Sequence, residues 1–143
     1  VRAAVSEARR LAPDLPLFAG GKSMGGRMTS TAASLDPLHG VLGLAFFGFP
    51  LHAAGKPSVD RGAHLADVGL PMLFLQGTRD KLAELDLLRP ILDDLGPSAS
   101  LHVVEGADHG FHVLKRSGRT DDEVLSEISS HFEQWNRALL GPR

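Results

Sequence analysis

Residues 19–27, AGGKSMGGR, form a glycine-rich segment between an apolar stretch, LPLFAGG (15–21), and a segment of small residues, RMTSTAAS (27–34). The apolar stretch is typical of a short strand and the segment after it of a helix. A strand that passes through glycines directly into a helix serves two kinds of chemistry in proteins. It holds the phosphates of a nucleotide, or it presents a serine nucleophile.

A phosphate-binding P-loop follows the pattern G-x-x-x-x-G-K-[ST]. Counting back from the Lys22-Ser23 pair, the first glycine of that pattern falls on Pro16. Proline has no amide hydrogen to donate to a phosphate, and the remaining loop is too short to wrap one. The G-x-S-x-G pattern of residues 21–25 therefore favours a nucleophile elbow over a nucleotide site.

In a nucleophile elbow the serine stands at the apex of a sharp turn between strand and helix. Ser23 occupies this position. We expect Gly21 and Gly25 to be needed because the strained turn leaves little room two residues before and after the serine. Gly26 is expected to let the helix pack closely on the sheet. The backbone amide of Met24, at the amino end of the helix, is expected to stabilise an oxyanion.

Strands and helices alternate along the whole chain. Beyond the first strand, apolar patterns predict strands at 39–50, 72–76 and 101–104. Helices are predicted within 1–14, within 85–95 and from the Thr120–Glu123 capping box to Gly141. Residues 51–70 are predicted to be mainly loop. Such alternation indicates an α/β fold, a three-layer α/β/α arrangement with a mostly parallel sheet of about four strands. We expect a single domain over 1–143.

A serine hydroxyl becomes an effective nucleophile only beside an imidazole that a carboxylate orients. Functional loops lie at the carboxyl ends of parallel strands. Asp80 follows the strand 72–76 and His109 follows the strand 101–104, so we predict Ser23 as nucleophile, Asp80 as acid and His109 as base. Asp108 is the alternative acid, although adjacent residues on a turn usually point apart.

Together the segments GGKSMGGR, LFLQGTRD and VVEGADHGF, with FFGFPLHAAGKP between them, resemble the α/β-hydrolase superfamily. More narrowly, they are similar to its dienelactone-hydrolase-like bacterial members and to the branch of testis-expressed protein 30. The resemblance covers nearly the whole chain and implies the same roles for Ser23, Asp80, His109 and the Met24 amide. It also implies a domain of about eight strands with the nucleophile after the fifth. The chain would then be the carboxyl-terminal half, lacking the loop that supplies the second oxyanion amide.

Composition limits the partners. The 15 Lys and Arg residues are scattered and the net charge is −2, which argues against nucleic acid or an anionic membrane as partner. The absence of cysteine suits a reducing, cytoplasmic location, and no apolar run approaches the roughly 20 residues of a membrane span. No cofactor is expected. We also expect no metal, because the remaining histidines lack ligand spacing and are interpreted as structural: His39, His52, His64, His102, His112 and His131.

The sequence therefore predicts a serine hydrolase acting on a small carboxylic ester or related acyl bond. The alternative is a catalytically weak or inactive hydrolase-like domain that serves as an interaction module. Lys22, Arg27 and Arg79 could favour an anionic substrate or be solvated surface charges. A homodimer is expected through the strand at 15–19, which would pair on one side only, or through the helix at 1–11.

Phe46, Phe47 and Phe49 could form an acyl pocket, but core packing is expected for at least one or two of them. The segment 49–70 is too short for a large cap domain. We therefore expect a shallow, open site that accepts a small substrate.

Overall fold

The computed structural model of the protein describes residues 1–141. Its four strands form one sheet in the order β1-β2-β3-β4, with every neighbouring pair parallel. The strands are β1 (Leu17–Lys22), β2 (Val41–Phe47), β3 (Met72–Gly77) and β4 (Ala99–Val104). The helices are α1 (Arg2–Leu11), α2 (Met24–Leu35), α3 (Leu85–Leu95) and α4 (Asp121–Leu140), with short 3₁₀ segments η1 (Asp60–Asp67), η2 (Gly96–Ser98) and η3 (Lys115–Ser117).

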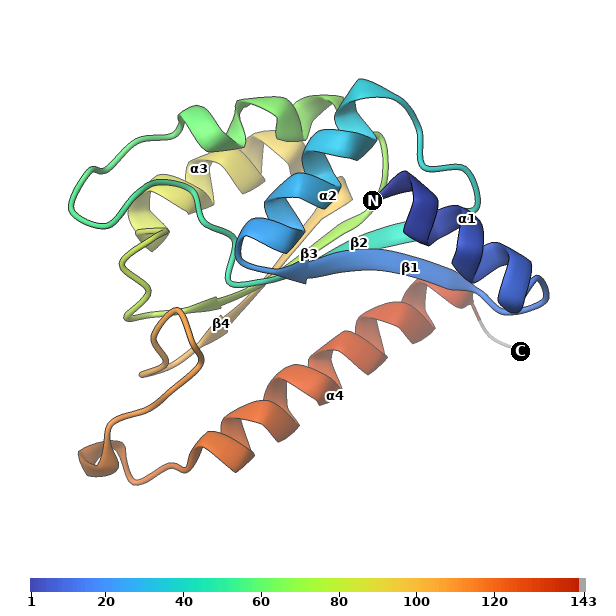
Figure 1. Cartoon of the computed structure of the whole chain (residues 1–143). Coiled ribbons are helices and arrows are strands. Elements are labelled where there is room, and N and C mark those ends of the chain that lie inside the picture. Colours follow the sequence, from blue (N-terminus) through green and yellow to red (C-terminus); the bar gives the residue numbers. More distant parts are fainter. Residues whose placement is uncertain (142–143) are drawn as a thin grey trace.

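The helices lie on both faces of the sheet, as expected when each strand returns through a helix to a parallel neighbour. Figure 1 shows α2 and α3 on one face and α4 along the other, with α1 beside β1. The three-layer α/β/α arrangement expected from the sequence is therefore confirmed, as is the parallel sheet of four strands.

The hydrophobic core is divided between the two faces of the central strands. On the face covered by α2 and α3, the rings of Phe46 and Phe74 pack with centroids 4.8 Å apart, and Phe49 contacts both. On the other face, Phe47 packs edge-on against Phe132 of α4. Phe46 and Phe49 are fully buried, so the core interpretation of these phenylalanines is correct.

Two features of the chain differ from expectation. The segment 51–70 is mainly loop, as expected, but it also contains an element that was not predicted, η1, which packs against α2. In α1, the predicted apolar face is only partly buried. Val5 packs against the core, whereas Leu11 remains 67% exposed because α1 lies at the open edge of the sheet.

The last helix begins as predicted. The Thr120 hydroxyl accepts the amide of Glu123 at 3.2 Å, and the Glu123 carboxylate accepts the amide of Thr120 at 2.7 Å. These bonds satisfy two amide groups that the first turn of a helix leaves free. Among residues 1–141, none of the helices combines the length and the apolar character that a membrane crossing requires.

Candidate active site

Three loops at the carboxyl ends of the strands bring the predicted site residues together. Ser23 follows β1, Asp80 follows β3 and His109 follows β4. The Ser23 hydroxyl lies 2.8 Å from Nε2 of His109, and Nδ1 of the same ring lies 2.7 Å from Oδ2 of Asp80. The structure therefore arranges hydroxyl, imidazole and carboxylate in one hydrogen-bonded chain.

Ser23 is held in a strained backbone conformation, with φ 52° and ψ −123°. A non-glycine residue in this region costs of the order of 1–3 kcal/mol, which the surrounding structure must support. Its amide donates to the carbonyl of Phe47 at 3.1 Å, and α2 begins at the next residue, Met24. As the first residue of the helix, Met24 has no intrahelical carbonyl acceptor for its amide. The turn therefore presents both a hydroxyl and an adjacent free N–H.

Glycine is required at this turn for close approach, but not at every position expected. A Cβ atom on Gly21 would lie 3.0 Å from the backbone of Gly25, and one on Gly26 would lie 2.6 Å from the carbonyl oxygen of Gly21. A Cβ atom on Gly25 would meet nothing within 4 Å. The steric reason expected for Gly25 is wrong, because this residue points away from the strand. Gly26 faces the strand, so the close packing expected at this residue is confirmed.

The Asp80 carboxylate is fully buried and accepts three hydrogen bonds. Oδ1 accepts the amide of Leu82 at 2.8 Å. Oδ2 accepts Nδ1–H of His109 and the side-chain amide of Gln76. A buried carboxylate needs this degree of pairing, because an unpaired charge inside a protein is strongly unfavourable. With Nδ1 as donor to Asp80, Nε2 of His109 is left to accept the Ser23 hydroxyl proton.

Gln76 is a site residue that the sequence analysis missed. It is fully buried at the end of β3, and its Oε1 accepts the amide of Phe49 at 2.9 Å while its Nε2 donates to Asp80. A single polar residue closing the apolar run MLFLQ four positions before Asp80 was the available signal. Buried amides of this kind are normally fully hydrogen-bonded.

The two candidate acids have different hydrogen-bond partners. Asp108 accepts the amides of Gly110 and His112 through Oδ1, at 2.8 and 3.0 Å. It therefore shapes the turn that carries His109, whose Nδ1 is directed to Asp80 instead. This imidazole remains 25% exposed and is reachable from solvent.

Four of the remaining histidines make structural hydrogen bonds. His52 is buried and accepts the amide of Glu84, His64 contacts Ser30, His102 contacts Glu127, and His112 contacts Asp121. The Asp121 carboxylate raises the pKa of the exposed His112. Burial and the nearby Arg27 lower the pKa of His64.

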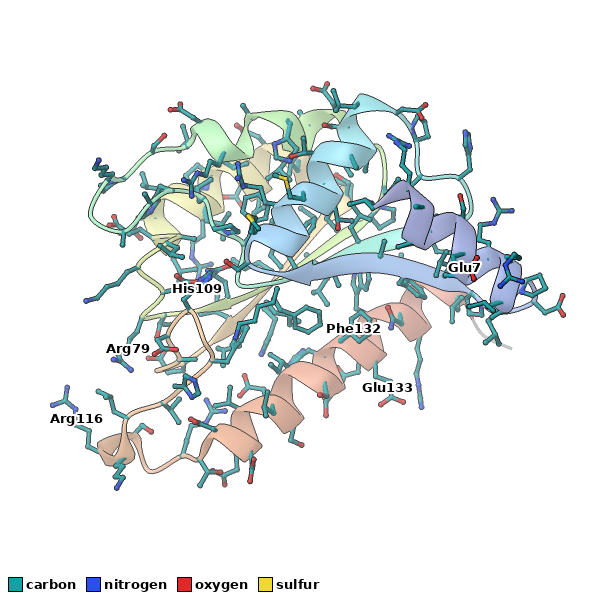
Figure 2. The ribbon with its side chains drawn as sticks, viewed as in Figure 1. Glu7, Arg79, His109, Arg116, Phe132 and Glu133 are labelled. Atoms are coloured by element: carbon teal, nitrogen blue, oxygen red, sulfur yellow. The ribbon has the colours of Figure 1, made fainter. Side chains whose placement is uncertain are left out.

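The three cations named in the sequence differ in their surroundings. Arg79 donates through Nη1 to the carbonyl of Gly106 at 3.2 Å. Figure 2 shows it farther toward the periphery than His109, which lies near the amino end of α2. Lys22 is exposed, and Arg27 lies one turn into α2.

Comparison with known proteins identifies the family and the fold. A family model described as an alpha/beta hydrolase domain matches residues 1–137. An α/β serine hydrolase without lid from Xanthomonas campestris is 22% identical, with 94% of this chain and 54% of that one aligned at a TM-score of 0.67. A serine hydrolase homologue from Coxiella burnetii is 19% identical, covering 78% of this chain and 49% of that one, with a TM-score of 0.62.

The esterase domain of a Rhodothermus marinus protein is 16% identical, covering 99% of this chain and 70% of that domain, with a TM-score of 0.64. The chain spans about half the length of the Coxiella and Xanthomonas proteins. At these identities the solved structures show the shared fold, and the family model matches nearly every residue. The chain belongs to the α/β-hydrolase family.

Proposed function

We propose that the chain is a serine hydrolase that cleaves a small carboxylic ester or a related acyl bond. The observation that carries the proposal is the continuous hydrogen-bonded chain from the Ser23 hydroxyl through His109 to Asp80, with distances of 2.8 and 2.7 Å. The strained backbone of Ser23 supports it, since strain of this kind concentrates at functional sites.

Each group has a role that follows from its position. Nε2 of His109 takes the proton as Ser23 Oγ attacks the carbonyl carbon, and the amide of Met24 donates to the oxygen that becomes negative. The imidazolium then protonates the leaving alkoxide as the ester C–O bond breaks. Asp80 holds the ring in the required tautomer and stabilises its positive charge. A water molecule, activated by His109, releases the acid and restores Ser23.

The sharpest test is covalent labelling with a fluorophosphonate, which reacts with activated serines. We expect one adduct, located on Ser23 by peptide mass mapping and abolished by Ser23→Ala. Ser30 is the matched control, because it lies on the same helix and also contacts an imidazole, that of His64. It is fully buried and donates to a carbonyl oxygen, so Ser30→Ala should leave labelling of Ser23 intact.

Labelling of Ser30, or labelling that persists in Ser23→Ala, would contradict the assignment of the nucleophile. A folded protein without any adduct, and without hydrolysis of p-nitrophenyl acetate, would favour the interaction module over the enzyme. We assign one oxyanion donor, and loss of such a donor costs about 10²–10³ in kcat in serine hydrolases. Labelling is therefore a more sensitive measurement than turnover.

A further inference from the structure

The proposed nucleophile immediately precedes α2, and a cation follows one turn later. Arg27 and Ser30 are three residues apart within α2, so their side chains project from the same flank of the helix, and Ser23 is the N-cap residue that precedes its first turn. The amide of Arg27 donates to the carbonyl of Ser23 at 3.2 Å. At the far end of this flank, Ser30 Oγ lies 2.7 Å from Nε2 of His64 in η1. Arg27 therefore lies between the proposed nucleophile and the contact with η1.

The guanidinium group of Arg27 makes no hydrogen bond and no ion pair with any residue in the described part of the chain. Its Nε is enclosed by protein atoms and lacks an acceptor. Other arginines of the chain are satisfied differently: Arg2 donates to backbone carbonyls and Arg119 to a carboxylate. A partly buried cation without a counter-ion, one helical turn after the proposed nucleophile, points to a negative charge supplied from outside the chain.

The neighbouring imidazole does not supply that charge. The Ser30 hydroxyl donates to the carbonyl of Arg27 at 2.9 Å, so Nε2–H of His64 is the donor in the Ser30–His64 contact. Burial and the charge of Arg27 lower the pKa of His64, while Asp67 acts in the opposite direction. An imidazole is neutral or positively charged, so His64 supplies no negative charge in either protonation state. Asp67, although close enough to affect this ring, forms no ion pair with Arg27 within the described residues.

We propose that Arg27 binds a carboxylate on the acyl part of the substrate, so that the protein prefers half-esters of short dicarboxylic acids. This proposal rests on the hydrolase function proposed above. Four residues of helix rise about 6 Å, and a helical side chain leans back toward the amino end. A carboxylate three or four bonds from the scissile carbonyl, as in succinyl or glutaryl esters, fits this spacing. The carboxylate is unchanged in the reaction; the bonds made and broken are those at Ser23.

Lys22 provides a matched control. It precedes Ser23 and carries the same charge, but its side chain is exposed and close enough to His112 to lower the pKa of that ring. His112 lies on the loop that follows β4, whereas Arg27 faces η1. Removing Lys22 therefore changes the net charge near the nucleophile without changing the flank that carries Arg27.

The first experiment compares mono-p-nitrophenyl glutarate with the neutral p-nitrophenyl valerate. We expect the wild-type ratio of kcat/KM to favour the glutarate, and Arg27→Met to reduce this ratio about 10- to 100-fold, the range for one charge-assisted hydrogen bond. Arg27→Lys should give an intermediate ratio. Lys22→Met should give a ratio within about twofold of wild type, because the exposed charge of Lys22 is screened by solvent and contributes little. An equal fall in Lys22→Met and Arg27→Met would overturn the proposal, since it would show only general attraction.

A second experiment does not depend on turnover. Monomethyl glutarate is titrated into the Ser23→Ala protein by calorimetry, with methyl valerate as the neutral analogue. We expect binding of the glutarate that weakens at least tenfold in the Ser23→Ala/Arg27→Met double variant, with unfolding curves showing that both proteins are folded. Equal binding by the two proteins would overturn the role of Arg27. Arg27-dependent binding without any hydrolysis by the wild type would support the Arg27 site and count against the hydrolase function.

Discussion

The side-chain amide of Gln76 donates to the carboxylate of Asp80 from within the same strand-to-loop segment, and both groups are shielded from solvent. Gln76 also accepts the amide of Phe49 at 2.9 Å, so it joins the loops that follow β2 and β3. The acid proposed for catalysis is thereby fixed by a neighbour that is not itself in contact with the reacting atoms. This makes Gln76 a positioning residue.

Replacing Gln76 by Met should lower kcat more than it changes KM. The change removes one donor to Asp80 and leaves the buried amide of Phe49 without an acceptor, which costs about 1–3 kcal/mol of stability. Gln76→Glu is the informative comparison, because it keeps an acceptor for Phe49 but places a second carboxylate against Asp80. We expect it to shift the acid limb of the kcat pH profile further than Gln76→Met. A purely structural role would leave that profile unchanged in both variants.

Asp80→Asn should preserve the fold and lower esterase activity by about 10⁴, the scale of the equivalent change in serine proteases. The asparagine amide cannot stabilise an imidazolium and favours the wrong tautomer of His109. Asp108→Asn should cost much less activity, because Asp108 accepts backbone amides in the turn. Steady-state kinetics on p-nitrophenyl acetate would measure both. Reversed effects would move the acid to Asp108.

The sequence predicted the order of elements well, because each depends on a local pattern. The buried run of β3 and the Thr120 capping box need only neighbouring residues to be recognised. Because Ser23, Asp80 and His109 each follow a strand of the same parallel sheet, β1, β3 and β4, they were expected in one cluster, since parallel strands end at the same edge of the sheet.

The remaining features depend on contacts between distant segments. Gln76 bonds to Phe49 across two strands, and η1 is held in place by packing on α2 rather than by its own periodicity. Which glycines of the turn face the strand depends on the direction in which α2 continues from Ser23. The G-x-S-x-G pattern does not specify this direction. Sequence reasoning expected close contacts at Gly21, Gly25 and Gly26, and the structure has them at Gly21 and Gly26 but not at Gly25.

Two glycine substitutions test this correction. Gly26→Ala places a methyl group 2.6 Å from the carbonyl oxygen of Gly21, and overpacking of this kind costs about 1–3 kcal/mol. Gly25→Ala meets no atom within 4 Å, and alanine is favoured over glycine in a helix by up to about 1 kcal/mol. Urea unfolding should therefore show Gly26→Ala destabilised and Gly25→Ala unchanged or more stable. Equal destabilisation by the two changes would contradict this geometry of the turn.

His64 should make stability depend on pH. Its pKa is lowered in the folded protein by burial and by Arg27, with Asp67 opposing them. The unfolded chain, with a histidine pKa near 6.5, therefore binds the proton more readily. The free energy of unfolding should fall as the pH decreases from about 6.5 toward the lowered value.

His64→Gln keeps a donor for Ser30 but cannot titrate, so the free energy of unfolding of this variant should depend less on pH in this window than that of the wild type. His112 contributes in the opposite direction, because its pKa is raised by Asp121. The free energy of unfolding of each variant is therefore compared with that of the wild type at the same pH, so that the contribution of His112 cancels. His39→Gln is the control, since His39 is exposed. A wild-type slope that persists in His64→Gln would refute the assignment.

The last prediction concerns the open side of β1. Within residues 1–141 this strand pairs with β2 alone, and its other edge faces away from the sheet. Its segment LFAGGK carries no charge before Lys22, and Leu15 just ahead of it is 69% exposed. Unpaired strand edges flanked by apolar side chains recruit another strand. We therefore propose that the 143-residue chain self-associates through β1 or the neighbouring α1, most simply as a two-fold dimer.

Light scattering over a range of concentrations should show a mass twice that of the monomer, and amide exchange in Leu17–Lys22 should slow as the dimer forms. Leu15→Lys should weaken the association at least tenfold, because two such charges would face each other across the two-fold axis. Leu125→Lys is the control, since Leu125 is 52% exposed on α4, on the other face of the sheet. A stable monomer with fast exchange throughout β1 would show that the edge tolerates water, and α1 would then be the element that protects it from aggregation.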